Sequence, residues 1–190
     1  MAESSNAPAY APDEVLEFTR TFDAPLALVW RLWRDPEHMV RWHGPEGYWL
    51  TQCEIDFRVG GRWQRTMSRA ADHAHRIWGE YLEIDEPHRL VFTYINDFDE
   101  HEMVVSLDFV ERDGRTVMHF HQAPFLTVEE RDSHGWGWQS GLDLFASYLL
   151  QVKAADGKLV GQPRRDGVAE DIVLARKRRE AVEGQQGRAK

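Results

Sequence analysis

Two pairs of histidines have the spacing at which both imidazoles share one face of a β-strand. His119 and His121 are separated by one residue, as are His73 and His75. Imidazole is a common metal ligand, but a metal site needs three or more ligands supported by further hydrogen bonds. The sequence places no third ligand beside either pair, and His119 falls on the strand face opposite Met118. We therefore expect surface or hydrogen-bonded histidines and no metal site.

The sequence offers little support for covalent catalysis. Its single cysteine, Cys53, falls in a predicted strand, and a buried thiol is usually inert. No G-x-S-x-G nucleophile elbow occurs, and Gly60-Gly61 lacks the spacing of a phosphate-binding loop, so we interpret that pair as a hairpin turn. These features assign no catalytic residue and no cofactor.

Four polar residues on predicted strands could perform acid–base chemistry if they share an apolar cavity. They are Arg65, Glu80, Tyr81 and Tyr94, and burial would shift the pKa of each group that ionises. A simpler interpretation pairs Arg65 with Glu80 across two strands on the surface. The sequence leaves both interpretations open.

Large apolar and aromatic residues on the same strands, and on the helix that follows them, are candidates for a cavity wall. Each one alone fits ordinary core packing. Together, so many rings between a curved sheet and a helix favour a void that holds a ligand. The predicted ligand-binding residues are Trp63, Arg65, Met67, Tyr81, Phe92, Tyr94, Met118, Phe120, Trp138 and Leu142.

A meander of strands must bring these residues together. Asp113-Gly114 is the strongest hairpin signal in the chain, because this dipeptide accepts the positive φ angles of a two-residue turn. Short links between consecutive strands predict an antiparallel sheet, and the apolar alternation predicts packing on one face. The strands are expected near residues 14–22, 51–57, 62–69, 77–85, 90–96, 102–111 and 115–121.

Helices are predicted on both sides of the meander. Asp23-Ala24-Pro25 and Asp35-Pro36 are start signals for two short helices after the first strand. Thr127 and Glu130 fit a capping box that opens a long helix reaching about residue 153. The apolar stripe of this helix is Trp138, Leu142, Phe145 and Leu149.

Three glycines lie in the first half of the long helix, at Gly135, Gly137 and Gly141. Each costs about 1 kcal/mol relative to alanine in a helix interior. Either the helix is irregular there, or another part of the chain approaches its backbone closely.

Length and composition restrict the class of protein. With 190 residues, 42% of them apolar, the chain suits one domain with tails. A formal charge of −9 argues against general nucleic-acid binding. No apolar run approaches the roughly 20 residues that span a bilayer, and the N-terminus lacks the features of a signal peptide. With a single cysteine, these features favour a cytoplasmic protein without membrane or nucleic-acid partners.

The chain divides into three expected parts. Residues 1–12 form a flexible lead, 13–153 a folded domain and 154–190 a charged extension with a short helix near 168–182. Residues 151–190 carry 10 Lys and Arg against 6 Asp and Glu. We expect tryptophans such as Trp49 and Trp78 to be exposed, and a homodimer is one arrangement that would cover them.

Five segments in order resemble a known family. They are "FDAPLALVWRLWRDPEHMVRWHGP", "IDFRVGGRW", "GEYLEIDEPHRLVFTY", "GRTVMHFHQAPF" and "HGWGWQSGLDLFASYLL", within residues 14–152. They resemble the activator of Hsp90 ATPase homologue 1-like family of the START-like, or SRPBCC, superfamily. The resemblance implies an α+β helix-grip fold of the Bet v 1-like type, in which a curved antiparallel sheet surrounds a long C-terminal helix and two short helices follow the first strand.

Three functional hypotheses follow from the sequence and the resemblance. The first is a protein that binds a small apolar or aromatic ligand in its cavity without a cofactor. The second is a cofactor-free enzyme of cyclase or hydrolase type that uses the same cavity. The third is an Hsp90-type co-chaperone or another interaction module. The superfamily includes all three kinds of protein, and its fold does not fix a reaction.

Overall fold

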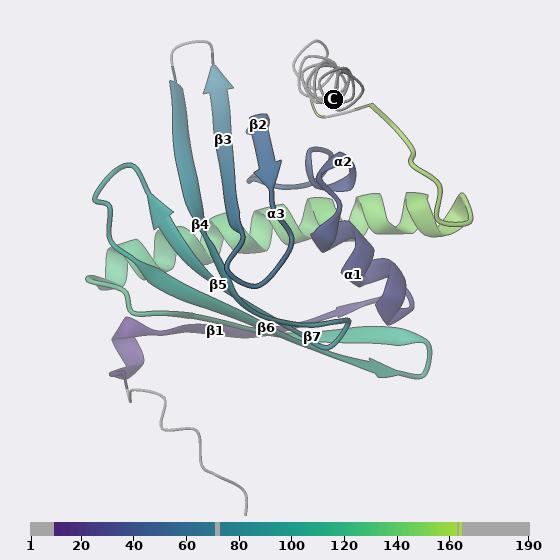
Figure 1. The fold of residues 1–190 in the computed structure, drawn as a ribbon, viewed down its shortest axis with the longest axis horizontal. Helices are drawn as coiled ribbons and strands as arrows, with labels where there is room; N and C mark the ends of the chain where they lie inside the picture. The colour runs from purple at the N-terminus through teal and green to yellow at the C-terminus, as the bar shows by residue number, and fades with distance from the viewer. Residues whose placement is uncertain (1–9, 71–72, 163, 165–190) are drawn as a thin grey trace, which may run out of the picture.

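Hydrogen bonds join seven strands into one antiparallel sheet in the computed structural model, which describes residues 10–70, 73–162 and 164 (Figure 1). The spatial order is β1-β7-β6-β5-β4-β3-β2. Each strand from β2 to β6 pairs with the strand that follows it in the chain, and β1 forms the edge of the sheet beside β7. The strands are β1 (Leu16–Phe22), β2 (Trp49–Ile55), β3 (Arg62–Ala70), β4 (His73–Asp85), β5 (Arg89–Asn96), β6 (Met103–Arg112) and β7 (Arg115–Ala123).

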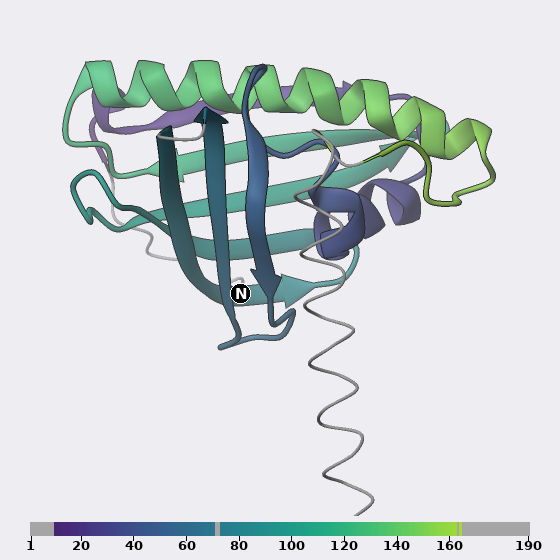
Figure 2. The same ribbon diagram turned by 90° about the horizontal axis from the view of Figure 1, so that it is seen from above.

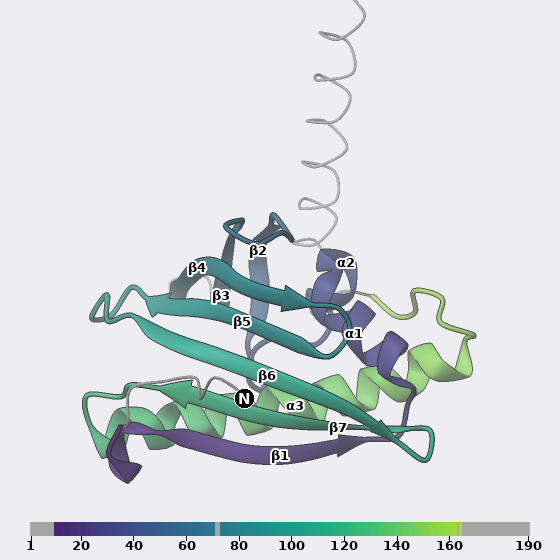
Figure 3. The same ribbon diagram turned by 60° about the horizontal axis from the view of Figure 1, so that its bottom comes forward.

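The helices cover one side of this sheet. A short 3-10 turn, η1 (Pro12–Glu14), precedes β1. Helices α1 (Leu26–Arg34) and α2 (Pro36–Met39) connect β1 to β2, and α3 (Val128–Ala154) follows β7. Figure 2 shows α3 running across the concave side of the sheet. In Figure 3, α1 and α2 lie toward the C-terminal end of α3.

This arrangement confirms the predicted α+β helix-grip fold with two short helices after the first strand. The predicted Asp113-Gly114 turn is also present, with φ angles of 52° and 72°, and it sets the register of β6 against β7. Among the described residues, no helix is both long and apolar enough to cross a bilayer. The short helix predicted near 168–182 lies outside the described residues.

The sheet packs on one face, as the alternation of side chains predicts. On β6 the residues Met103, Val105, Leu107 and Phe109 are all buried in the core. On β7 the exposed His119 lies on the opposite face, where its Nδ1 is 3.0 Å from the Thr19 hydroxyl. Within the described part of the chain, no three His, Cys, Asp or Glu side chains are placed to hold a metal ion.

The start of α3 differs slightly from the predicted capping box. The Thr127 hydroxyl accepts a hydrogen bond from the Glu130 N–H at 3.1 Å, as expected. The Glu130 carboxylate, however, accepts from the N–H of Leu126 at 2.9 Å instead of reaching the N–H of Thr127. The helix is therefore capped, and Glu130 satisfies the backbone N–H of the residue that precedes the N-cap.

The expectation of exposed tryptophans is wrong for Trp49, which is only 7% exposed. Helix α2 packs beside β2, the strand that Trp49 begins. Trp78 is half-buried, with the Arg76 guanidinium 4.6 Å from its ring centroid. The burial of Trp49 removes part of the reason for expecting a homodimer, which stays a prediction.

A buried histidine joins α2 to α3. His38 is 6% exposed, and its Nδ1 lies 2.8 Å from the Tyr148 hydroxyl. Burial, aided by the charge of Arg31, lowers the pKa of His38 from 6.5 to about 4. As the pH falls, His38 therefore becomes protonated in the unfolded chain at a higher pH than in the folded protein. The stability that depends on neutral His38 is fully present above pH 6.5 and is lost as the pH falls toward 4.

We predict that His38→Gln weakens the acid sensitivity of folding. The difference in unfolding free energy between pH 7 and pH 4 should shrink by about 2–3 kcal/mol, because glutamine does not titrate there. Urea unfolding at several pH values measures this difference. Tyr148→Phe is the matched control, which removes the hydrogen bond and keeps His38 buried. An unchanged pH profile in His38→Gln would contradict the prediction.

Candidate functional site

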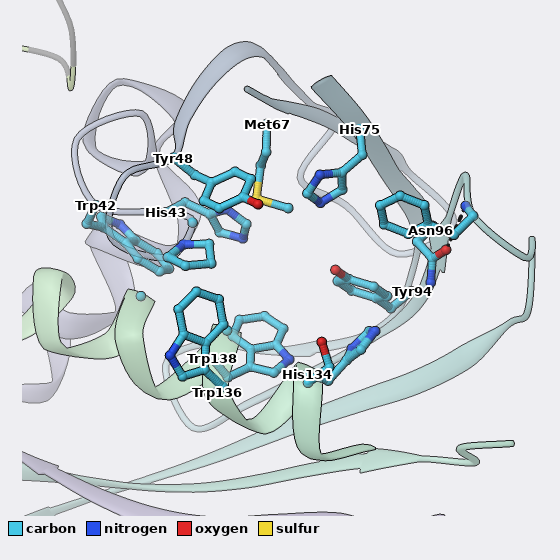
Figure 4. Close-up of a pocket in the computed structure, with 16 residues that line it drawn as sticks. Trp42, His43, Tyr48, Met67, His75, Tyr94, Asn96, His134, Trp136 and Trp138 are labelled. Carbon is cyan, nitrogen blue, oxygen red and sulfur yellow. Dashed lines mark hydrogen bonds between the residues drawn. The ribbon is translucent and has the colours of Figure 1, made fainter. Parts of the chain in front are cut away.

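A cavity of about 250 Å³ lies between the first half of α3, strands β3 to β5 and the segment before β2 (Figure 4). Most of its wall is aromatic or apolar. Phe98 is 72% exposed and Trp136 is 60% exposed, so these two side chains mark the open rim. The lining residues are Trp42, His43, Gly44, Pro45, Tyr48, Met67, His75, Tyr94, Asn96, Phe98, Ser133, His134, Trp136, Gly137, Trp138 and Gly141.

One wall consists of residues 42–45, which we call the wall segment. It packs directly on α3, because a Cβ at Gly141 would lie only 3.4 Å from the Gly44 carbonyl oxygen. Gly44 itself has a φ of +97°, a backbone conformation that residues other than glycine rarely adopt. Helix α3 is continuous over Val128–Ala154, so the close approach of another backbone explains Gly141, whereas the atoms nearest to Gly135 and Gly137 belong to side chains.

The C-terminal extension holds the wall segment from outside. Arg164 donates to the carbonyl oxygens of Trp42 at 3.3 Å, Gly44 at 3.0 Å and Pro45 at 3.0 Å. One guanidinium thus binds three carbonyl oxygens within residues 42–45, which its planar fork of donors permits. The segment that shapes the cavity therefore depends on a residue more than a hundred positions away.

A second arginine holds the same segment from the sheet. Arg65 on β3 is 2% exposed and donates from Nη1 to His43 Nε2 at 3.0 Å. Arginine is always a donor, so Nε2 of His43 must be unprotonated and the ring proton must lie on Nδ1. Burial lowers the pKa of His43, and the positive charges of Arg65 and Arg164 lower it further. His43 is therefore a neutral ring with an Nδ1–H.

A similar chain fixes the proton of His134 on α3. The indole N–H of Trp138 donates to the Gln122 oxygen at 2.8 Å, so the amide nitrogen of Gln122 is the donor to His134 Nδ1 at 3.2 Å. Burial lowers the pKa of His134. The neutral His134 ring therefore carries its proton on Nε2.

Two β5 side chains add further donors. In Figure 4 the Tyr94 hydroxyl points toward the middle of the cavity. Burial raises the pKa of Tyr94, so its hydroxyl keeps its proton. Asn96 accepts a hydrogen bond from the Phe98 N–H at 2.9 Å through its side-chain oxygen, which leaves its NH₂ as a donor. The polar part of the wall thus consists largely of neutral hydrogen-bond donors.

The predicted site residues divide between the cavity and the core behind it. Met67, Tyr94 and Trp138 line the cavity. The role of all ten residues in binding stays a prediction. Those that are buried outside the lining are Trp63, Arg65, Tyr81, Phe92, Met118, Phe120 and Leu142.

The surface pair of Arg65 with Glu80 is wrong. In the register of β3 and β4, Arg65 lies opposite Ile77, and Arg62 lies opposite Glu80. Arg65 shares the buried face of β3 with Trp63, whose ring centroid is 4.4 Å from the guanidinium carbon. Strand alternation places Arg65 on this inner face, since it is two residues from Trp63.

Several cavity residues escaped the sequence-based prediction, above all His43, His134 and Trp136. His43 reaches the site through the wall segment, whose path is set by tertiary packing. A signal in the sequence is the pair Gly44 and Gly141, which lie where two backbones are in close contact.

Comparison with known proteins agrees with this fold. A family model described as "Activator of Hsp90 ATPase homolog 1-like protein" matches residues 23–150, more than half of the chain. No curated protein matches the chain.

Solved structures resemble the chain over most of their own length. A protein of Nitrosomonas europaea has a TM-score of 0.66 and 22% identity, covering 76% of this chain and 99% of its own. A protein of Chromobacterium violaceum has a TM-score of 0.65 and 23% identity, covering 72% and 96%. The AHSA1 protein of Silicibacter pomeroyi has a TM-score of 0.65 and 24% identity, covering 72% and 98%. Identities this low show the fold alone.

We predict that Arg164→Ala loosens the wall segment. Loss of three charge-assisted hydrogen bonds should lower the unfolding free energy by about 1–3 kcal/mol and speed amide hydrogen exchange around residues 42–48. Exchange followed by mass spectrometry measures the local effect. Lys158→Ala is the control, because Lys158 is an exposed cation of the same extension. Equal exchange in the two variants would contradict the assigned role of Arg164.

Proposed function

We propose that this chain, which belongs to the Activator of Hsp90 ATPase homolog 1-like family, binds a small ring-bearing ligand in the cavity beside α3. The observation that carries the proposal is the wall itself, in which tryptophan, tyrosine and phenylalanine rings surround a partly open space. Ligand pockets are typically apolar and concave with a few convergent polar groups. A volume of about 250 Å³ lies just below the usual range of roughly 300–1,000 Å³, which suits a ligand of one or two rings.

The rim supports the same proposal. Phe98 and Trp136 expose large apolar surfaces where the cavity opens. Exposed apolar side chains at the mouth of an apolar hollow are a common feature of binding sites. A bound ring would cover part of both side chains and gain from removing that surface from water.

The polar groups favour holding a ligand over transferring protons. An acid–base pair needs two groups whose pKa values are pushed apart, so that one donates and the other accepts. Here burial keeps His43, His134 and Tyr94 all in their neutral forms. Each offers a hydrogen, so the set is suited to fixing the orientation of a ligand with acceptor atoms.

A cytoplasmic location is part of this proposal. Cys53 is buried, and burial raises its thiol pKa to about 11, so it is poorly suited to disulfide exchange. A structure that makes no use of its cysteine for cross-linking suits a reducing compartment.

We predict that Gly137→Leu blocks the cavity without unfolding the protein. Gly137 lines the cavity within α3, and a Cβ there would lie 3.8 Å from the Pro45 Cγ, an ordinary contact. A leucine should raise helix stability by up to about 1 kcal/mol while filling part of the space. Fluorescence titration with the neutral probe N-phenyl-1-naphthylamine should show binding to the unaltered protein and at least tenfold weaker binding to this variant.

Gly137→Ala is the matched control. It makes the same gain in helix propensity and adds only a methyl group, so probe binding should persist. Equal binding of the probe by Gly137→Leu and Gly137→Ala would show that the ligand sits elsewhere. Failure of the unaltered protein to bind would remove the proposed function for ligands of this class.

A further inference from the structure

The lining of the cavity differs in charge from the protein as a whole. The chain carries a formal charge of −9. Even so, no aspartate or glutamate is found among the described residues that line the cavity. Two guanidinium groups lie directly behind the wall segment, Arg65 on the sheet side and Arg164 on the outer side. Two positive charges therefore lie at this wall, and Glu46 is near enough to offset part of the fall that burial causes in the pKa of Arg164.

Arg65 is a buried cation without a carboxylate partner. None of the ion pairs between described residues includes it. Its surroundings are neutral: the Trp63 ring, the His43 imidazole, the Tyr81 hydroxyl and the Cys53 thiol. A buried charge is costly unless it is paired. The charge of Arg65 would therefore attract an anion that entered the neighbouring cavity.

The influence of Arg65 extends along the cavity wall. Its charge offsets part of the rise that burial causes in the pKa of Tyr94, and burial with Arg65 lowers the pKa of His43. Both of these residues line the cavity. The charge is therefore felt by two groups that a ligand would meet, although Arg65 itself lies behind the wall.

The donors complete the arrangement. His43 Nδ1, which carries the ring proton, is buried and has no hydrogen-bond partner among the residues that the structure describes. The Nε2–H of His134, the hydroxyl of Tyr94 and the side-chain NH₂ of Asn96 add three more hydrogens at the same cavity. Hydrogen bonds to ionised acceptors are the strong ones. An anionic oxygen in the cavity would be a stronger acceptor for such donors than a neutral one, and its charge would complement that of Arg65.

We propose that the cavity selects ring-bearing ligands that carry an anionic oxygen, such as a carboxylate, and that Arg65 acts as a positioning residue. This inference rests on the proposed function. The ring lies among the aromatic side chains, and the anionic oxygen accepts hydrogen bonds from the neutral donors of the wall. Arg65 supplies the positive field and holds His43 in the Nδ1–H tautomer.

The test compares two probes of the same shape by isothermal titration calorimetry at pH 7. At this pH 2-naphthoate is an anion, whereas 2-naphthamide is neutral. We expect 2-naphthoate to bind the unaltered protein about tenfold more tightly. In Arg65→Met the preference should disappear. In Arg62→Met, which removes an exposed arginine of the same strand, it should persist.

Two further measurements separate positioning from mere structural support. Arg65→Lys keeps the charge and should retain most of the preference. Imidazole ¹⁵N NMR should show His43 as the Nδ1–H tautomer in the unaltered protein and a shift away from it in Arg65→Met. An unchanged His43 tautomer in folded Arg65→Met would overturn the positioning role.

The unaltered protein decides the charge preference even if Arg65→Met does not fold. Equal or tighter binding of 2-naphthamide overturns the preference and leaves the ligand-binding proposal standing. If neither probe binds, the proposed function fails and this inference fails with it.

Discussion

The close approach of the Gly44 backbone to Gly141 of α3 is the contact on which the cavity depends. A side chain at position 141 would meet the Gly44 carbonyl oxygen at 3.4 Å, and Gly44 adopts a φ of +97°. These two glycines let the wall segment lie against the helix. The helix thereby loses some intrinsic stability, since glycine is a poor helix former. The loss is offset where the segment gains hydrogen bonds from Arg164 and Arg65.

The cavity beside this contact brings together polar residues from distant parts of the chain. Strand β3 contributes Arg65, the first half of α3 contributes His134, and the C-terminal extension contributes Arg164. The position of the ring proton in each histidine is set by a neighbouring group that can only donate. For His43 this group is the Arg65 guanidinium, and for His134 it is the Gln122 amide nitrogen, whose orientation is fixed by the Trp138 indole. The result is an aromatic cavity whose polar atoms mainly donate. This feature belongs to the site, and membership of the fold family does not supply it.

Sequence reasoning recovered the strands, the Asp113-Gly114 hairpin and the long helix, because periodicity and turn chemistry are local properties. It recovered the cavity only in part. The sequence places Phe120 on the correct face, but Phe120 packs against the tilted ring of Trp138, with centroids 4.9 Å apart, and does not line the cavity. His43 and Trp136 could not be placed, since their positions depend on how the wall segment and α3 pack together. The sequence names Arg65, but only the register of β3 against β4 shows that it lies opposite Ile77 and not Glu80.

The most direct test of the central claim is to map where a ring-bearing anion binds, by two-dimensional ¹H–¹⁵N NMR during titration with 2-naphthoate. The cavity account predicts chemical-shift changes concentrated in the wall segment, around residues 133–141 of α3 and near Tyr94, with His119 and the outer face of the sheet unchanged. Changes confined to that outer face, or none at all at saturating probe, would contradict it.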